Sequence, residues 1–474
     1  MLRVVKLFGL GAALVVSVIG LSVESLRSQP YTVCPSGCPF SKIQAALDAA
    51  KDGDTITVGP GVYRENLKIT KSVSLIGAGA AQTRVMPAHP GIDLILVELG
   101  DFNSPKPLEQ VRLEGFTFQG PLHSEDGIAL IRNWAPLRSL QLRQNIFRDA
   151  KPPATGIEIF YSEEFVAEGN SSSGVLTTLD IRGGRQIRVA RNRLESVMVD
   201  PAWQDEQGQP IESRAEVVDN DVSGGIGVSG NTIVRNNRLR GGSIGVGVGS
   251  NHPVDFVQVL NNELIGPGVL RRSPDISWGI HLGDSGDRVL IEGNKITNYD
   301  VGIMVSTFYS PPPHVQIRKN VISQGLWGIY FERLWREASR FEIIDNTIDR
   351  QKSPDPTRPF AGAAIFVDSQ VGQDQDKTEI LLQGNTFRLG DYGVLLAPYS
   401  GKFEFQGNKI TDNDLFGVLL AVPPCGEVTD PAKVQVTGSG NEIANNGKRL
   451  PPEVKARGDG EGNVCPKELT ALKK

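Results

Sequence analysis

The sequence predicts an all-β solenoid of about a dozen coils, with three short parallel strands in each coil. Two recurring phrases support this prediction. In the first, alternating apolar residues are followed by Asn, any residue, and then Ile, Leu or Phe, and it returns every 26 residues from Asn294 to Asn320 to Asn346. In the second, Gly is followed by alternating apolar residues, as in Gly279–Leu282. A period of about 20–30 residues that carries short alternating segments is typical of a β-solenoid.

The Asn phrase predicts one corner of each coil. Its copies centre on Asn145, Asn192, Asn237, Asn262, Asn294, Asn320, Asn346, Asn385, Asn408 and Asn441. Asn tolerates left-handed backbone angles and bonds to local backbone, so we expect it to form the sharp turn itself. Coils stacked about 4.8 Å apart would also let the side-chain amides pair along the axis.

The Gly phrase predicts the first strand of each coil. Its copies begin at Gly279, Gly302, Gly328, Gly393 and Gly417. In the coil that contains His281, we expect strands at Gly279–Leu282, Val289–Gly293 and Lys295–Thr297. Inward Ile, Val and Leu residues would then form continuous columns from coil to coil.

The order of these phrases resembles the pectate-lyase-like superfamily of right-handed parallel β-helices. The start of the chain adds to the likeness, because Ser41-Lys-Ile-Gln44 has the pattern of a capping box before a short helix, Ile43–Ala50. The resemblance covers residues 31–450 and implies a single-stranded right-handed parallel β-helix with an N-terminal capping helix. It implies no one activity, since the superfamily includes lyases, hydrolases, esterases, epimerases and non-enzymes. The characteristic motifs of the polygalacturonases and alginate epimerases are not found in this sequence.

The first residues predict export. Arg3 and Lys6 precede an apolar run from Leu7 to Leu21, which suits a signal peptide better than a membrane span of about 20 residues. Cleavage after Ser22 and an uncleaved anchor both remain open. We therefore divide the chain into a signal peptide or anchor (1–28), a β-helix (31–450, with a cap at 31–52) and a C-terminal tail (451–474).

Four cysteines, Cys34, Cys38, Cys425 and Cys465, are expected to form disulfides in an exported protein. Three pairings are possible, and proximity in the sequence favours Cys34–Cys38 with Cys425–Cys465, which would tie back the C-terminal tail. The alternative is a zinc site that uses all four thiolates, which would require the two ends of the stack to meet.

A groove along the outer face of the first strands is the candidate site that the resemblance implies. Alternation places His281 outward, with Gly227 and Gly247 as a low floor beside it and Asp275 and Asp284 in the adjoining turns. Carboxylates beside a basic group suit acid–base chemistry on a polysaccharide, so we predict His281, Asp275 and Asp284 as catalytic residues. The predicted substrate-binding residues are Glu158, Gly227, Gly247, Arg271, Tyr330 and Trp335. The simpler alternative is that the Asp residues cap turns and His281 is a solvated surface residue.

Further along the same face, the alternation predicts an apolar stripe. It comprises Met304, Tyr330, Phe366, Leu395 and Leu419. Exposed apolar patches beyond a few hundred Å² are rare, so a core covered by loops or by the C-terminal segment is the favoured interpretation. Aromatic residues that stack on sugar rings are the alternative.

Two functions of different classes fit these observations. One is a carbohydrate-directed protein, either a binding module or a divergent lyase or hydrolase. The other is a non-catalytic structural or surface-interaction solenoid. The net charge of −5 and the scattered Lys and Arg residues argue against nucleic acid. We expect a monomer whose partner is a polysaccharide, with membrane contact only through an uncleaved N-terminal segment. No motif indicates a metal or cofactor, and a calcium ion is the one candidate we keep.

Overall fold

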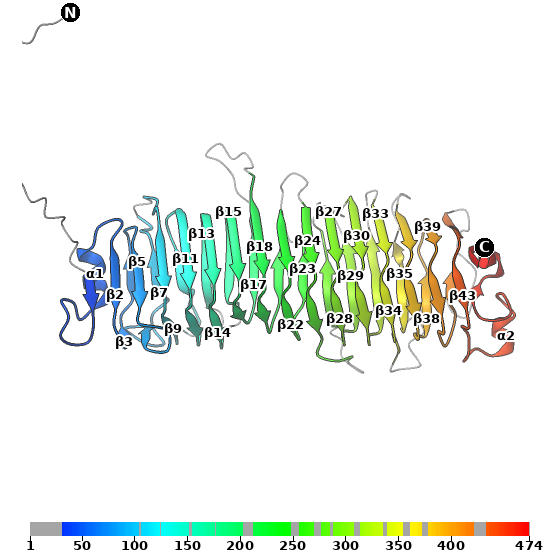
Figure 1. The fold of residues 1–474 in the computed structure, drawn as a ribbon, viewed down its shortest axis with the longest axis horizontal. Helices are drawn as coiled ribbons and strands as arrows, with labels where there is room; N and C mark the ends of the chain where they lie inside the picture. The colour runs from blue at the N-terminus through cyan, green and yellow to red at the C-terminus, as the bar shows by residue number, and fades with distance from the viewer. Residues whose placement is uncertain are drawn as a thin grey trace, which may run out of the picture.

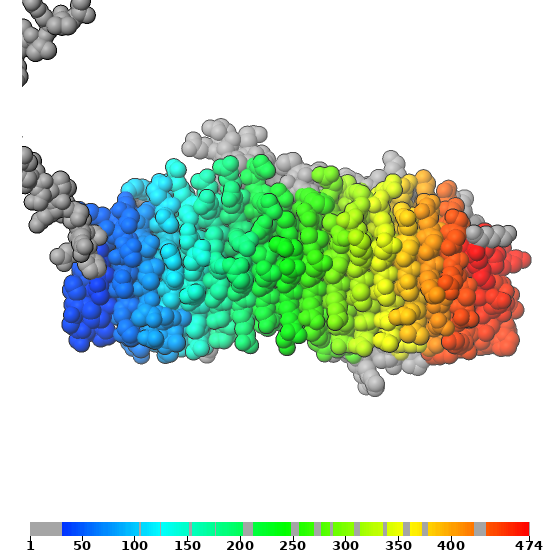
Figure 2. Space-filling view, viewed as in Figure 1, coloured from blue at the N-terminus to red at the C-terminus, as the bar shows by residue number. Residues whose placement is uncertain are grey.

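The fold is an elongated stack of coils, in which all the strand pairings of the described residues are parallel. The computed structural model describes residues 31–103, 106–123, 125–150, 154–175, 177–201, 212–247, 256–269, 276–284, 288–307, 313–334, 339–353, 361–371, 378–420 and 433–473. Figure 1 shows the strands side by side along the rod, with the coils in chain order from one end to the other. The space-filling view shows the same rod as successive bands of colour (Figure 2).

Each coil contributes up to three strands, which form three rows along the rod. The first strands are β4 (Leu67–Ile69), β7 (Ile95–Leu99), β10 (Ala129–Asn133), β17 (Val197–Asp200), β20 (Ile226–Val228), β23 (Ile244–Val246), β26 (Trp278–Leu282), β29 (Val301–Thr307), β32 (Trp327–Leu334), β35 (Ala363–Val371), β38 (Tyr392–Leu396), β41 (Val418–Leu420) and β44 (Val464–Cys465). The second strands are β1 (Tyr31–Val33), β2 (Thr55–Val58), β5 (Ser74–Gly77), β8 (Val111–Glu114), β11 (Leu137–Arg143), β18 (Arg214–Val218), β21 (Thr232–Arg235), β24 (Phe256–Leu260), β27 (Arg288–Glu292), β30 (His314–Arg318), β33 (Arg340–Ile344), β36 (Glu379–Gln383), β39 (Gly401–Gln406) and β42 (Val434–Ser439).

Two long strands, β13 (Thr155–Glu168) and β15 (Leu179–Ala190), run through both of these rows and join them into one sheet, which has 29 strands in the described part of the chain. The third strands form a separate sheet, with 15 strands among the described residues. They are β3 (Gly61–Arg64), β6 (Thr83–Met86), β9 (Thr117–Gln119), β12 (Ile146–Arg148), β14 (Ser171–Ser173), β16 (Arg193–Leu194), β19 (Asp221–Val222), β22 (Arg238–Arg240), β25 (Glu263–Ile265), β28 (Lys295–Thr297), β31 (Val321–Ser323), β34 (Thr347–Asp349), β37 (Thr386–Arg388), β40 (Lys409–Thr411) and β43 (Glu442–Ala444). The predicted solenoid of parallel strands is therefore confirmed.

A continuous ladder of asparagines runs along the corner between the second and third strands. In each step, the backbone N–H of one Asn donates to the Oδ1 of the Asn in the next coil at 2.8–3.0 Å. The Nδ2 of each Asn donates to the same Oδ1 and to a backbone carbonyl, as Asn320 does to Ile291 at 2.9 Å. Because these groups are buried, the ladder satisfies backbone polar atoms that water cannot reach.

The sharp turn itself is made by the residue before each ladder Asn, which corrects the expectation that Asn adopts the left-handed conformation. Positive φ occurs at Gln144, Gly169, Arg191, Asp219, Asn236, Asn261, Gly293, Lys319, Asp345, Gly384, Gly407 and Gly440. The ladder Asn residues are selected for their side-chain hydrogen bonds, while the strained backbone position precedes them.

Two ladder members, Asn170 and Asn220, do not match the predicted phrase. Asn170 is followed two residues later by Ser172, and Asn220 is followed by Val222, where the phrase requires Ile, Leu or Phe. Both still pair with their neighbours, Asn170 through Asn192 at 2.8 Å and Asn220 through Asn237 at 3.0 Å.

The helix α1 (Ile43–Ala49) covers the N-terminal end of the stack, where Ile43, Ala46 and Leu47 are buried against the main apolar core. The helix is placed as predicted, but the capping box is wrong. Its N-cap residue is Lys42, which makes no side-chain cap. Instead the Glu65 carboxylate accepts the backbone N–H groups of Ile43 and Gln44 at 2.9 and 3.1 Å. The cap is therefore supplied by a loop of the first coil, which local sequence spacing does not reveal.

The C-terminal segment covers the other end. It contains α2 (Pro452–Lys455), β44 and the 3₁₀ helix η1 (Lys467–Lys473), whose Leu469 and Leu472 are buried in the main core. The Nδ2 of Asn441, the last ladder residue, donates to Leu472 O at 2.9 Å. The ladder and the core thus both end on this segment.

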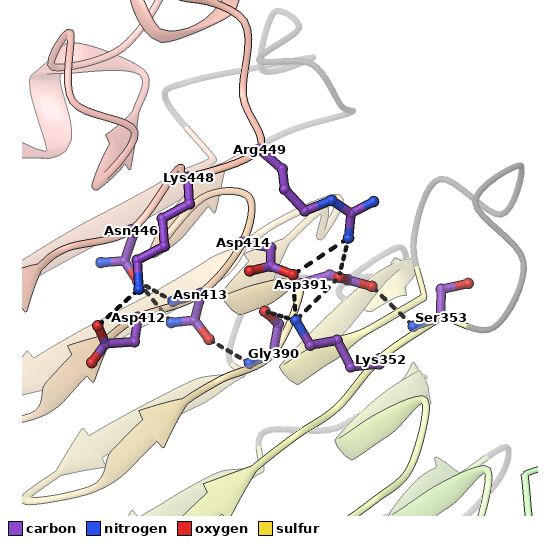
Figure 3. A network of polar contacts seen from close by, with 10 residues as sticks. All are labelled: Lys352, Ser353, Gly390, Asp391, Asp412, Asn413, Asp414, Asn446, Lys448 and Arg449. Atoms are coloured by element: carbon purple, nitrogen blue, oxygen red, sulfur yellow. Dashed lines mark hydrogen bonds and ion pairs between the residues drawn. The ribbon is translucent and has the colours of Figure 1, made fainter.

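Charged residues also hold the C-terminal segment to the preceding coils (Figure 3). Arg449 Nη1 lies 3.2 Å from Asp391 and 3.4 Å from Asp414, and Lys352 pairs with Asp414 as well. Asp391 also accepts the backbone N–H of Ser353 at 2.9 Å. Burial raises the pKa of the Asp391 carboxyl, although Ser353, Lys352 and Arg449 work in the opposite direction. The two cations therefore offset the cost of keeping a buried carboxylate in this turn.

The disulfide Cys34–Cys38 is present at the N-terminal end, as predicted. Cys465 is also disulfide-bonded, while Cys425, its predicted partner, lies outside the described residues. In the part of the chain that the structure describes, no helix is long and apolar enough to cross a membrane. The predicted signal peptide or anchor also lies outside that part.

Candidate functional site

The outward residues of the first strands form a continuous row along the rod, which we call the first-strand row. Its members are register partners in adjacent coils: Lys68, Glu98, Arg132, Glu158, Asp180, Met198, Gly227, Gly245, His281, Met304, Tyr330, Phe366, Leu395, Leu419 and Cys465. The predicted position of Gly247 is wrong, because the partner of His281 is Gly245. Gly247 lies two residues further along, where its N–H donates to Val228 O at the start of the turn.

A charged and aromatic segment occupies the N-terminal part of this row together with the residues two positions further along each chain segment. We define it as Arg132, Trp134, Glu158, Phe160, Asp180 and Arg182. Arg132 Nη1 lies 3.0 Å from the Glu158 carboxylate, and its guanidinium lies 4.4 Å from the Trp134 ring centroid and 5.2 Å from that of Phe160. In the next coil, Arg182 donates two hydrogen bonds of 3.1 and 2.6 Å to the Asp180 carboxylate. Its guanidinium carbon lies 5.6 Å from the Phe160 ring centroid.

These contacts join the side chains of the segment to one another. A bidentate Arg–carboxylate pair fixes both side chains, and a guanidinium over an aromatic ring adds further attraction. Glu158, predicted as a substrate-binding residue, is therefore part of an ordered surface, with its side chain 13% exposed.

A shallow pocket of about 200 Å³ follows the segment and is floored by Gly227. We call it the floor pocket; its polar lining is Asp180, Arg182, Asp200 and Ser229. The Met198 side chain lies over Gly227, since a Cβ there would come within 2.4 Å of the Met198 Sδ. Ser229 is 3% exposed, and its hydroxyl has no hydrogen-bond partner in the structure. A buried hydroxyl without a partner is costly unless something else satisfies it.

Next to the floor pocket, Gly245 leaves the row bare. A Cβ at Gly245 would have no heavy atom within 4 Å. Gly245 therefore leaves the surface beside His281 bare, whereas the Met198 side chain fills the space above Gly227. Gly245 takes the place expected of Gly247, and the binding role predicted for this surface stays a prediction.

His281 stands at the far end of this floor, partly buried, with its ring centroid 5.4 Å from that of Trp278. Burial lowers the pKa of the imidazole, while the charges of Glu332 and Asp284 act in the opposite direction. Glu332 was missed in the sequence because it lies at a bulge in β32, between Phe331 and Arg333, where alternation breaks. Asp275 lies outside the described residues, so the predicted grouping of Asp275, His281 and Asp284 stays a prediction.

The apolar stripe is buried, which confirms the favoured interpretation. Met304, Tyr330, Phe366, Leu395 and Leu419 belong to a second apolar cluster outside the main core, against which Leu450 and Val454 of the C-terminal segment pack. The Tyr330 ring lies between Trp327 and Phe366, with centroids 5.1 and 5.0 Å away. Its hydroxyl donates to Asp368 at 2.9 Å.

This packing corrects the prediction for Tyr330, whose ring has no open face left for a sugar. Two other predicted substrate-binding residues, Arg271 and Trp335, lie outside the described residues.

A larger concavity of about 550 Å³ lies on the second-strand face, lined by Glu164, Arg185, Gln186, Arg188, Arg214 and Glu216 among others. Its charges are largely used within the protein, since Arg214 pairs with Glu216 at 2.9 Å and Arg188 pairs with the same carboxylate. Its aromatic residue, Phe165, is fully buried. We favour the smaller floor pocket, because it adjoins rings that are partly exposed and contains an unsatisfied hydroxyl.

Among the side chains that the structure describes, no three His, Cys, Asp or Glu residues are placed to hold a metal ion. The calcium ion kept as a candidate gains no support from these residues.

A match to a known protein family supports the fold. Residues 278–450 match a family model described as a right-handed β-helix region. No curated protein matches the sequence. One similar solved structure is the catalytic unit of a GH87 α-1,3-glucanase from Streptomyces thermodiastaticus strain HF3-3. It has 14% identity and a TM-score of 0.46, and the match covers 88% of this chain and 69% of that one.

Two others are the A-module of the mannuronan C-5 epimerase AlgE6 of Azotobacter vinelandii and PfbA, a surface adhesin of Streptococcus pneumoniae. The first has 14% identity and a TM-score of 0.40 and covers 85% of this chain and 94% of that one. The second has 12% identity and a TM-score of 0.34 and covers 85% and 86%. Likenesses at this level assign no function. The matched family model and the parallel three-strand coils nevertheless lead to one conclusion: this chain is a right-handed parallel β-helix protein.

Proposed function

We propose that the protein binds a polysaccharide, which lies along the first-strand row from Arg132 to His281. The observation that carries this proposal is the charged and aromatic segment, which leads directly into the floor pocket and the bare surface at Gly245. Aromatic faces can stack on the apolar face of a sugar ring, and fixed charged groups can bond to its hydroxyls. From Arg132 to His281 there are six coil spacings of about 4.8 Å, roughly 29 Å in all, which is long enough for several sugar units.

The test is a binding measurement on the full chain against a polysaccharide panel, by affinity electrophoresis. Trp134→Ala is expected to weaken binding about tenfold, because it removes a partly exposed ring whose other face supports Arg132. Tyr399→Ala is the matched control, since Tyr399 is also exposed and carries a cation, Lys433, at 4.7 Å, but lies outside the row. Equal loss in both variants, or none in Trp134→Ala, would refute the proposed site.

We also propose that the chain is exported. Disulfides at Cys34–Cys38 and at Cys465 support this, since disulfides persist mainly in oxidising compartments. Peptide mapping of protein from the native host is expected to find Cys34–Cys38 and Cys425–Cys465. Four free thiols would contradict both the pairing and the export.

A further inference from the structure

We infer that the floor pocket takes an uncharged sugar, so that the groove selects neutral polysaccharides over polyuronates and over polyamines. This inference rests on the proposed function and names the class of ligand. It follows from the state of the charged groups around the pocket and from the buried hydroxyl of Ser229.

The cations of the groove are already neutralised. Arg182, the guanidinium that lines the pocket, binds both oxygens of Asp180. Arg132 pairs with Glu158, and its side chain is only 20% exposed, so little of this guanidinium is open to an incoming ligand. A uronate carboxylate would have to compete with Asp180 and Glu158 for these guanidinium groups.

The remaining charge is negative. The pocket is lined by two carboxylates, Asp180 and Asp200, against the single guanidinium of Arg182. Nearer the N-terminal end, Glu98 and Glu158 alternate in the row with Lys68 and Arg132. The excess of negative charge is therefore confined to the pocket. A polyanion that entered the pocket would meet this like charge, which repels it.

A cationic sugar is not favoured either. Asp180 and Glu158 are paired with arginines, and Asp200 has an interaction partner of its own. An ammonium group would have to break one of these arrangements to gain a carboxylate. The charged groups that line the pocket are therefore already engaged within the protein, whether the ligand is an anion or a cation.

The unused partner is the Ser229 hydroxyl, which can both donate and accept one hydrogen bond. Ser229 lines the pocket together with Asp200 and Gly227, and its hydroxyl is buried there. A sugar hydroxyl is the complementary group, because it is uncharged and also donates and accepts. The volume of about 200 Å³ is below the roughly 300–1,000 Å³ of sites for drug-sized ligands, so one ring is expected to enter it.

The experiment measures dissociation constants of the full chain at low and at physiological salt. The probes are neutral glucan, mannan and xylan, the polyuronates polygalacturonate and alginate, and chitosan as a polyamine. At least one neutral polymer is expected to bind tenfold or more tightly than any charged one, with little dependence on salt. Ser229→Ala is expected to weaken that binding about fivefold through the lost hydrogen bond, whereas Ser223→Ala, an exposed serine in a third turn, should not change it.

Tighter binding of a polyuronate or of chitosan would overturn the inference and leave the proposed function standing. An unchanged affinity in Ser229→Ala would overturn the role of the pocket. If no polysaccharide of any class binds, the proposed function itself fails.

Discussion

Asn320→Leu is expected to destabilise the protein by about 2–4 kcal/mol, because it leaves at least two buried backbone groups without partners. In the native ladder, Asn320 accepts from the backbone N–H of Asn294 at 2.9 Å and donates to the carbonyl of Ile291 at 2.9 Å. Leucine is similar in size but can do neither. The midpoint of urea denaturation, followed by circular dichroism, measures the change.

Val321→Ala is the matched control, because Val321 is the next residue and its side chain points outward with 46% exposure. Exposed substitutions of this kind usually change stability by about 0.5 kcal/mol or less. Similar midpoints for Asn320→Leu and Val321→Ala would show that the ladder does not stabilise the stack.

Gly245→Trp is expected to abolish polysaccharide binding, with a dissociation constant raised at least 100-fold. The new ring would project from the floor into the path of the polymer, since nothing lies within 4 Å of the Cβ position. The fold should remain intact, because the backbone at Gly245 is not in the left-handed region. The same change at Gly247 would be a poorer test, since its φ of +87° strains any other residue.

Isothermal titration calorimetry with the polymer that binds best measures this effect. Lys295→Trp is the control, because Lys295 is an exposed outward residue of a third strand in the coil of His281. If Gly245→Trp binds the polymer as tightly as Lys295→Trp does, the polymer does not lie over Gly245.

The fold could be predicted from the sequence because the recurring Asn and Gly phrases fit stacked coils of short parallel strands and no other common fold. In the coil of His281, the predicted strands agree with β26, β27 and β28 to within about one residue at most ends. Ladder members were missed where the following apolar residue changed, as after Asn170 and Asn220. The cap by Glu65 was missed because it depends on a contact between segments more than 20 residues apart.

The site was harder to predict, for a physical reason that Gly245 illustrates. The segment Ile244-Gly-Val-Gly-Val has glycine at every second position, so a shift of two residues keeps the same faces and the sequence cannot set the register. The charged and aromatic segment combines residues from adjacent coils. The loops between these coils differ in length, so the sequence does not show which residues become neighbours. One signal was available: Arg132-x-Trp134, Glu158-x-Phe160 and Asp180-x-Arg182 repeat the same spacing in three successive coils.

The most direct test of the first-strand groove is the location of bound polysaccharide, measured by carbene footprinting of the full chain with and without a saturating ligand. We expect protection of Trp134, Phe160 and Met198, all on the first-strand side, with no change at Arg188 and Glu216 on the second-strand face. Protection at Arg188 and Glu216, which line the larger concavity, with Trp134 and Met198 unchanged, would contradict it.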